Sequence, residues 1–425
     1  NPAAPHRSPR PELRRVVVTG LGLITSIGTG VEAVWSALQE RKPGIRPISR
    51  FDASGFRCRV AGEVTDFEPE AYLERKQVRR LDRYSQLAVS ASKLALADAA
   101  LDPGVVDPER SGVCVGSALG GVGFGEENHT AYLRDGWKAV HPMLALSIFI
   151  GAGSCNIAIE CGFTGPATAN GDSCSAGAIA LSNALRYIQL GQADRMLAGG
   201  VEAPLYPVVF GAFDLIQAMS KQLDPPERAC RPFDRTRDGF VMGEGAAMLL
   251  LEAEEVALAR GARIYGELAG AALTNDAHHM TAPRPDGKSA LRCMERALED
   301  AGMTADEVDT VNAHASGTPL NDKTETLALK QLLGERAYSV PVSGVKSLFG
   351  HPLGASGAIE AAVSCLSLHH GFIPATANLQ EPDPDCDLDY VLDGPRRRPV
   401  GSVLSNSFGF GGINAALVFR NGERG

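Results

Sequence analysis

The chain has 425 residues, 44% hydrophobic and 21% charged, with a formal net charge of −9 at pH 7. This length predicts two closely packed halves rather than one small core. The acidic balance, without a basic block, argues against nucleic acid as the main partner. Nine scattered cysteines form no CxxC pair and no zinc-spaced cluster, so we expect reduced thiols, no metal and a cytoplasmic protein. No apolar stretch of about 20 residues predicts a membrane span.

The N-terminal segment combines a tail with a first strand. Residues 1–14 are rich in proline and arginine and are expected to form a disordered tail. Residues 16–18 predict a short buried strand, with a tight turn after it at Gly20 and Gly22. Thr25 stands where a dinucleotide-binding fingerprint needs its third Gly or Ala, which disfavours a Rossmann cofactor site.

Helical and strand patterns then alternate along the chain. Helices are predicted over 31–40, 83–101 and 289–303, strands over 111–118 and 308–316, and a loop running into a last strand over 402–419. This alternation predicts an α/β fold with buried sheets. The order of strand, glycine turn and helix recurs and predicts a seam near 255–265. We therefore expect an N-terminal half over 15–260 and a C-terminal half over 261–425.

The stretch "GDSCSAG" at residues 171–177 predicts a tight turn before a buried helix. Asp172 or Ser173 is expected to cap this helix. Cys174 would then lie at the helix N-terminus, where the dipole and free N–H groups favour a thiolate. A serine nucleophile would need a strong base beside it, and the GxSxG frame lacks its second glycine, so a serine hydrolase is disfavoured. A purely structural turn stays open as an alternative.

Two histidines stand where catalytic side chains gather in α/β folds. His314 ends a predicted strand, and His351 lies in a glycine loop that opens a helix. By spacing alone, a structural role is as good an interpretation for each of them. The pair at 369–370 ends an apolar helix, where a cation is favoured without any catalytic role.

Four motifs join Cys174 in the order expected of one family: "PFDRTRDGFVMGEGAAMLLLE", "NAHASGTPLNDKTE", "GVKSLFGHPLGASGAIE" and "SNSFGFGGINAALVF". From about Arg15 to Phe419 the chain resembles the β-ketoacyl-[acyl-carrier-protein] synthases, nearest to the elongating type II branch that includes polyketide ketosynthases. The resemblance implies the thiolase fold, two similar αβαβα halves in a five-layered structure, usually as a dimer, with no cofactor. The implied reaction is decarboxylative condensation of malonyl-carrier protein with an acyl chain.

The resemblance also implies roles for individual residues. Cys174 would carry the acyl chain as a thioester. His314 and His351 would hydrogen-bond to the enolate oxygen that forms when CO₂ leaves. Lys346 would set the electrostatics of the site, and Glu325 would belong to the same network.

Further residues would bind the substrate. Phe410 would complete the oxyanion hole through its backbone N–H, together with that of the nucleophile, and its ring would gate access. Ser316 and Thr318 would hold the phosphopantetheine arm. Three sites depart from the usual pattern: Asp172-Ser173 in place of small residues before the nucleophile, where the carboxylate could raise the pKa of the thiol, Ser316 in place of Thr, and Ile413 in place of Thr. These departures leave the substrate range open.

An acidic synthase needs a local basic patch to bind an acidic carrier protein. The segment "ERKQVRRLDR" supplies one, with Arg75, Lys76, Arg79, Arg80 and Arg83. A solvated helix face is the alternative interpretation. The expected partners are acyl- and malonyl-loaded acyl carrier protein and a second subunit, which is either a copy of the chain or a chain-length-factor-like protein.

One rival function resembles the enzyme in sequence. The chain itself could be a non-elongating relative or a chain-length-factor-like subunit that shapes a partner synthase. Cys174 and the two histidines argue against this interpretation. The sequence leaves open the acyl chain length and the choice between a fatty-acid and a polyketide pathway.

Overall fold

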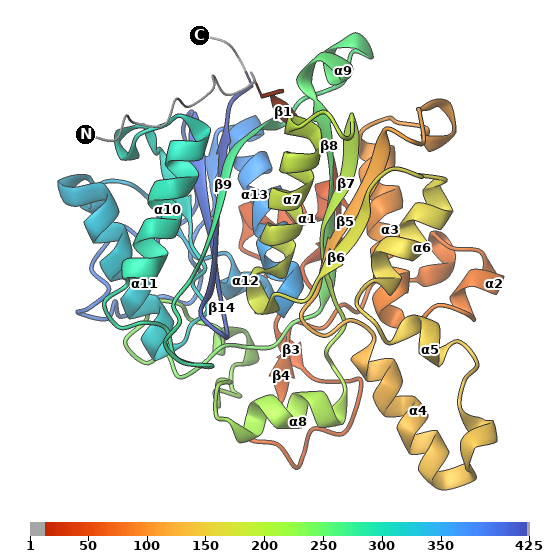
Figure 1. Ribbon diagram of the computed structural model, residues 1–425. Coiled ribbons are helices and arrows are strands. Elements are labelled where there is room, and N and C mark those ends of the chain that lie inside the picture. The colour runs from red at the N-terminus through yellow and green to blue at the C-terminus, as the bar shows by residue number, and fades with distance from the viewer. Residues whose placement is uncertain (1–12, 423–425) are drawn as a thin grey trace, which may run out of the picture.

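The structure, a computed structural model that describes residues 13–422, is built on one mixed eleven-stranded sheet (Figure 1). Its strands follow the order β11-β10-β14-β15-β9-β1-β8-β7-β5-β6, and β2 pairs with β1. The strands are β1 Val16–Thr25, β2 Gly28–Thr29, β5 Ser111–Gly116, β6 Ala167–Asn170, β7 Arg195–Glu202, β8 Gly245–Ala253, β9 Gly266–Asn275, β10 Thr310–Asn312, β11 Val342–Ser343, β14 Ser402–Gly409 and β15 Ile413–Arg420. Two small ladders pair β3 (Arg46–Pro47) with β4 (Val60–Ala61), and β12 (Phe372–Ile373) with β13 (Arg396–Arg397). Residues 1–12 of the expected tail lie outside the described residues.

The α-helices are α1 Val31–Glu40, α2 Arg75–Val78, α3 Arg83–Asp98, α4 Val122–Asp135, α5 Leu144–Ser147, α6 Ala152–Cys161, α7 Ala176–Gln189, α8 Pro207–Leu215, α9 Glu254–Ala259, α10 Lys288–Ala301, α11 Pro319–Leu333, α12 Lys346–Phe349 and α13 Ser356–His370. Short 3₁₀ turns are η1 Pro69–Ala71, η2 Pro103–Val105, η3 Trp137–Ala139, η4 Ser173–Ser175, η5 Pro226–Arg228, η6 Ala305–Glu307, η7 Gly334–Tyr338 and η8 Leu353–Ala355. No helix within residues 13–422 is long and apolar enough to cross a membrane.

Each half of the sheet repeats one topology. Numbered in chain order within its half, both β6-β5-β7-β8-β1 and β11-β10-β14-β15-β9 read 3-2-4-5-1. The pairing directions also agree, since the first three strands of each series are parallel and the remaining pairs are antiparallel. The halves join where β1 and β9 pair through Val17–Glu267 and Val18–Gly266. The prediction of two similar α/β series is confirmed.

The helices form three layers around the two halves of the sheet (Figure 1). Helices α3 and α6 cover one outer face, α10 and α11 lie on the opposite outer side, and α7 and α13 fill the middle. Small residues let the central helices meet, because a Cβ on Gly177 of α7 would lie only 3.0 Å from the backbone nitrogen of Ala358 of α13. The result is the five-layered αβαβα arrangement expected from the resemblance.

The predicted turn at Gly20 and Gly22 is wrong, because both glycines lie inside the ten-residue strand β1. They are needed for close packing against α3. A Cβ on Gly20 would lie 2.2 Å from the carbonyl oxygen of Ala95, and one on Gly22 would lie 1.8 Å from that of Ala91. The absence of a side chain therefore allows a close approach between strand and helix rather than a change of direction.

The C-terminal stretch 402–419 also differs from its prediction. It forms two antiparallel strands, β14 and β15, where a loop and one strand were expected. The turn between them contains Gly411 and Gly412, both with positive φ. This hairpin brings residues 409–413 against the turn that carries Cys174.

Candidate active site

Cys174 lies in η4, the turn between β6 and α7, and its side chain is buried. The first turns of α7 are wholly buried, as predicted. The predicted cap is wrong, because neither the side chain of Asp172 nor that of Ser173 accepts a hydrogen bond from an N–H group at the start of the helix. The turn is anchored instead by Ser175, whose hydroxyl lies 3.0 Å from the carbonyl oxygen of Ser407 and 2.8 Å from that of Ile413.

The same turn occurs in the other half and positions His351. There η8 precedes α13 as η4 precedes α7, and Leu353 has a positive φ of 38° where Ser173 has 53°. His351 lies just before η8. Its backbone N–H donates to the carbonyl oxygen of Val241 (2.7 Å), and its Nδ1 lies 2.8 Å from the hydroxyl of Ser356. Both contacts fix the imidazole in a buried position.

His314 follows β10 and faces His351, with ring centroids 5.3 Å apart and nearly perpendicular planes (84°). The Glu325 carboxylate on α11 holds the backbone at this point, because it accepts the N–H groups of His314 (2.8 Å) and Ala315 (2.9 Å). The Nδ1 atom of His314 is buried without a hydrogen-bond partner among residues 13–422. The imidazole is therefore oriented through its backbone rather than through its ring.

Lys346 links these elements from a fully buried position. Its Nζ donates to the carbonyl oxygen of His314 (2.6 Å) and to the carboxylate of Glu360 on α13. Burial, and after it the positive charge of Lys346, holds the pKa of both His314 and His351 well below the usual range. Both imidazoles are therefore neutral at neutral pH, with one N–H donor each.

The thiol of Cys174 is surrounded by groups that favour its ionised form, yet burial is stronger. The hydroxyl of Ser173, the charge of Lys346 and the backbone N–H of Phe410 all favour the thiolate. Burial nevertheless raises the pKa of the Cys174 thiol above its usual value. The lowered pKa expected from the helix N-terminus is therefore wrong for the free protein, because desolvation outweighs the local donors.

One pocket of about 360 Å³ connects these groups to the surface. Cys174, His314 and His351 line its buried part, whereas Met280 (72% exposed) and Leu320 (58% exposed) lie at its outer part. Ser316 and Thr318 line it as well, with their hydroxyl oxygens 3.0 Å apart. The pocket can thus admit a thin chain whose reactive end reaches the sulfur.

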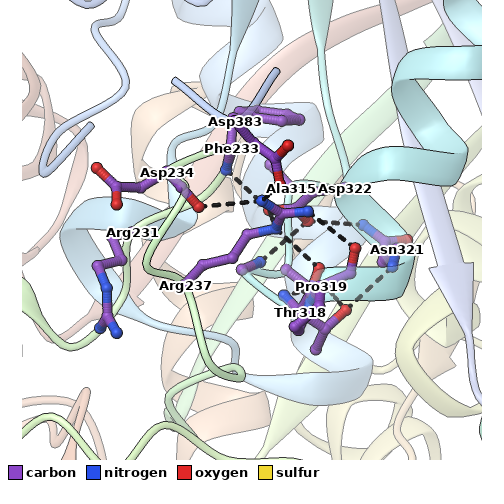
Figure 2. Close-up of polar contacts among 12 residues, drawn as sticks. Arg231, Phe233, Asp234, Arg237, Ala315, Thr318, Pro319, Asn321, Asp322 and Asp383 are labelled. Atoms are coloured by element: carbon purple, nitrogen blue, oxygen red, sulfur yellow. Dashed lines mark hydrogen bonds and ion pairs between the residues drawn. The ribbon is translucent and has the colours of Figure 1, made fainter. Parts of the chain in front are cut away.

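A buried ion cluster supports the loop that carries these two hydroxyls (Figure 2). The Arg237 guanidinium donates to the carbonyl oxygens of Thr318 (3.3 Å) and Pro319 (2.9 Å). It also pairs with Asp383 (2.6 Å) and Asp322 (3.5 Å). Since the carbonyls of the loop are held by a nearly fully buried side chain, the hydroxyl pair has a fixed place in the pocket.

The basic segment divides into two parts. Arg75, Lys76, Arg79 and Arg80 are exposed, and none has an ion-pair partner among the described residues. Arg83 does not belong to this surface, because its nearly buried side chain makes two hydrogen bonds of 2.8 Å to the carboxylate of Glu244. Helix α2 lies at the margin of the molecule, well apart from β14, whose Phe408 and Gly409 line the pocket (Figure 1).

Three residues of the site were not predicted from the sequence. Glu360 is the ion-pair partner of Lys346, and Ser356 contacts His351. Glu202 ends β7 and accepts hydrogen bonds from the N–H groups of Ala118, Leu119 and Gly354 and from the hydroxyl of Ser117. Glu360 had a sequence signal, because it is the one carboxylate in a helix that is otherwise made of apolar and small residues up to its two terminal histidines.

The sequence matches one family over most of its length. Residues 13–257 match the N-terminal domain of β-ketoacyl synthases, and residues 265–380 match their C-terminal domain. The chain belongs to the β-ketoacyl synthase family. It is 46% identical over 409 residues to 3-oxoacyl-[acyl-carrier-protein] synthase 2 of Synechocystis, covering 96% of this chain and 98% of the relative.

Solved ketosynthases have the same thiolase fold. The ishigamide ketosynthase/chain length factor superimposes with a TM-score of 0.91 at 38% identity, covering 97% of this chain and 100% of that one. AntDE:AntF, a type II polyketide acyl-carrier protein in complex with its ketosynthase, gives a TM-score of 0.90 at 36% identity, covering 96% and 100%. The predicted fold and family are confirmed, and this β-ketoacyl synthase is an acyltransferase of the elongating class.

Proposed function

We propose that this synthase elongates an acyl chain held on Cys174 by condensing it with malonyl-carrier protein. The observation that carries the proposal is the meeting of Cys174, His314 and His351 in one pocket, with the Phe410 N–H directed at the sulfur. The two histidines come from the opposite half of the fold to the cysteine. The presence of these three residues in one pocket favours an active synthase over a chain-length-factor-like subunit, which does not need a Cys-His-His set.

The chemistry follows from the protonation states of these residues. The Cys174 thiolate attacks the acyl thioester, and the backbone N–H groups of Cys174 and Phe410 hold the oxyanion. When malonyl-carrier protein loses CO₂, the neutral imidazoles of His314 and His351 donate hydrogen bonds to the enolate oxygen. The resulting carbanion attacks the acyl-cysteine. Lys346 assists by keeping both imidazoles unprotonated, because a second positive charge beside it is unfavourable.

Carrier-protein recognition is assigned to two regions. Ser316 and Thr318 hold the phosphopantetheine arm inside the pocket, and Glu325 together with the Arg237 cluster keeps their loop in place. The four exposed cations in and just after α2, Arg75, Lys76, Arg79 and Arg80, attract the acidic carrier protein. A charge reversal at Lys76 and Arg80 to Glu is expected to raise KM for acyl-carrier protein and to leave small thioester substrates little changed. Equal losses on both substrate types would count against docking at α2.

A second subunit is assigned to the free edge of the sheet. Within the described residues, β6 pairs only with β5, and its residues are exposed or half-exposed. Apolar Phe149 and Ile159, before and within the neighbouring helix α6, are also exposed. A free edge beside apolar side chains is a template for strand pairing. The second subunit is either a copy of this chain or a chain-length-factor-like protein. The side chain of Gln77 on α2 donates a hydrogen bond to Glu160 on α6, so the docking helix is attached on this side of the molecule.

The nine free thiols support the predicted cytoplasmic location.

The decisive experiment is intact-protein mass spectrometry after incubation with acyl-carrier proteins carrying two to sixteen carbons. Adducts on the wild type that are absent from Cys174→Ala would establish the acyl-enzyme, and the preferred length would indicate the pathway. The absence of adducts with every donor, both alone and with an added partner subunit, would overturn the proposal.

A further inference from the structure

Ser173, the residue before the nucleophile, combines an unfavourable backbone conformation with a hydroxyl beside the sulfur. Its φ of +53° lies in the left-handed region, which favours glycine over other residues. Its Oγ lies 3.8 Å from Sγ of Cys174, within hydrogen-bond range for a sulfur acceptor. A glycine would satisfy the backbone better, so the side chain needs its own explanation.

The internal repeat separates the backbone of Ser173 from its hydroxyl. In the equivalent turn η8, Leu353 takes the same place and also has a positive φ. The conformation is therefore a property of the turn in both halves, whatever the side chain. What distinguishes Ser173 from Leu353 is the oxygen, and this oxygen points at the reacting atom.

The buried surroundings of the Cys174 sulfur make a hydrogen bond from the Ser173 hydroxyl important for the stability of the thiolate. Cys174 is only 6% exposed, so water contributes little to the solvation of a thiolate. The Phe410 N–H is another donor directed at the sulfur, and Lys346 acts on it from further away, since its Nζ is bonded to His314 and Glu360. Because the sulfur itself is so little exposed, one additional O–H donor makes a large relative difference to the stability of the thiolate.

We infer that Ser173 is a further catalytic residue, whose hydroxyl donates a hydrogen bond to the Cys174 thiolate; this rests on the proposed function. In loading, the Cys174 thiol gives up its proton, the sulfur lone pair forms the bond to the acyl carbon, the carbon–sulfur bond to pantetheine breaks, and the pantetheine sulfur takes up a proton in exchange. In condensation, the new carbon–carbon bond forms, and the electron pair of the Cys174 carbon–sulfur bond returns to the sulfur. The hydroxyl favours the thiolate at the start of the first step and at the end of the second, because a thioester sulfur is a poor acceptor.

The test is the pH profile of Cys174 alkylation by iodoacetamide, followed by mass spectrometry of the peptide that contains Cys174. Ser173→Ala removes the hydroxyl and keeps the Cβ, whereas Ser173→Gly removes the hydroxyl and relieves the backbone. Both are expected to shift the profile to higher pH and to slow alkylation at pH 7 by about threefold to tenfold. Ser175→Ala is the matched control, because its hydroxyl contacts the carbonyls of Ser407 and Ile413 rather than the sulfur.

The groups that could titrate around the sulfur are the same in every variant: Asp172, Glu202, His314, Lys346 and His351. Profiles of both variants that superimpose on the wild type would overturn the inference. A shift in only one of them would also overturn it, by assigning the effect to the backbone. Alkylation needs no acyl donor, so a failure of the proposed condensation would be seen separately, as missing adducts with a normal alkylation profile.

Discussion

At the scale of single residues, the two buried imidazoles of the candidate site, His314 and His351, are neutral. A neutral imidazole donates a hydrogen bond only from the nitrogen that carries its proton. The hydrogen-bond partner of the other nitrogen determines which nitrogen that is. For His351 the partner is the hydroxyl of Ser356 at Nδ1. When that hydroxyl donates to Nδ1, the proton of His351 lies on Nε2 and is available to the substrate. The Nδ1 atom of His314 has no such partner within residues 13–422, and its position depends on Glu325 and Lys346, which hold its backbone.

Ser356→Ala is therefore expected to lower kcat for malonyl decarboxylation by about tenfold, because the proton of His351 is no longer held on one nitrogen. Alkylation of Cys174 should keep its rate. Ser364→Ala on the same helix is the control, because its hydroxyl contacts the Glu360 carbonyl rather than an imidazole. A decarboxylation rate equal to that of the wild type would contradict this role for Ser356.

Glu202 gives a prediction for stability. Burial raises its pKa to about 7, from 4.5 for an ordinary glutamate. Between these pH values the folded state binds more protons than the unfolded one, so stability falls as pH rises through the window. Relative to Glu202→Gln, the wild type is expected to lose about 3 kcal/mol between pH 4.5 and 7 and to stay level above that. Urea unfolding at pH 5, 6, 7 and 8 measures this, and a constant difference would refute it.

At the scale of elements, hydrophobic periodicity predicted the helices, whereas features that depend on long-range contacts could not be predicted from the sequence. The helices at 31–40 and 83–98 follow their apolar pattern. The sequence predicts too short a strand β1, because Gly20 and Gly22 are typical of a turn. In the structure these glycines allow close packing against α3, which lies more than 60 residues away in sequence. The motif residues of the site were predictable through the resemblance. The partners of Ser356 and Glu360 on α13 were not, because their contacts with His351 and Lys346 depend on how this helix packs, although Glu360 stands out as a lone carboxylate.

Gly22→Ala tests the contact between strand and helix. The added Cβ would lie 1.8 Å from the backbone oxygen of Ala91, which cannot move without shifting α3. The free energy of unfolding is expected to fall by about 3 kcal/mol or more. Gly55→Ala is the control, because a Cβ there meets nothing within 4 Å. Equal urea midpoints for the two variants would show that α3 yields easily.

At the scale of the whole molecule, the site exists only because two halves meet. The cysteine belongs to the N-terminal half and both histidines to the C-terminal half. The halves are held together by the short contact of β1 with β9, by the packing of α7 and α13, and by polar contacts such as the ion pairs of Arg237 with Asp322 and Asp383. The free edge at β6 is a separate surface, on which a further subunit would extend the sheet.

The subunit proposal predicts the effect of a charge on that surface. Ile159→Lys places a cation on an apolar side chain that is 79% exposed, and should convert a dimer into single chains in sedimentation. Val105→Lys alters an equally apolar, 77% exposed side chain on η2 and should leave the dimer intact. If both variants sediment as the wild type does, the edge near α6 is not the interface.

The repeat of the nucleophile turn has one more consequence. Gly354 in η8 corresponds to Cys174 in η4. A Cβ at Gly354 would lie 2.4 Å from the backbone nitrogen of Ala118 and 2.7 Å from a carboxylate oxygen of Glu202. A cysteine at position 354 would therefore clash with the backbone at Ala118 and with the Glu202 carboxylate. Of the two equivalent turns, η4 carries a thiol and η8 has no room for one. The two halves of the fold are therefore not interchangeable.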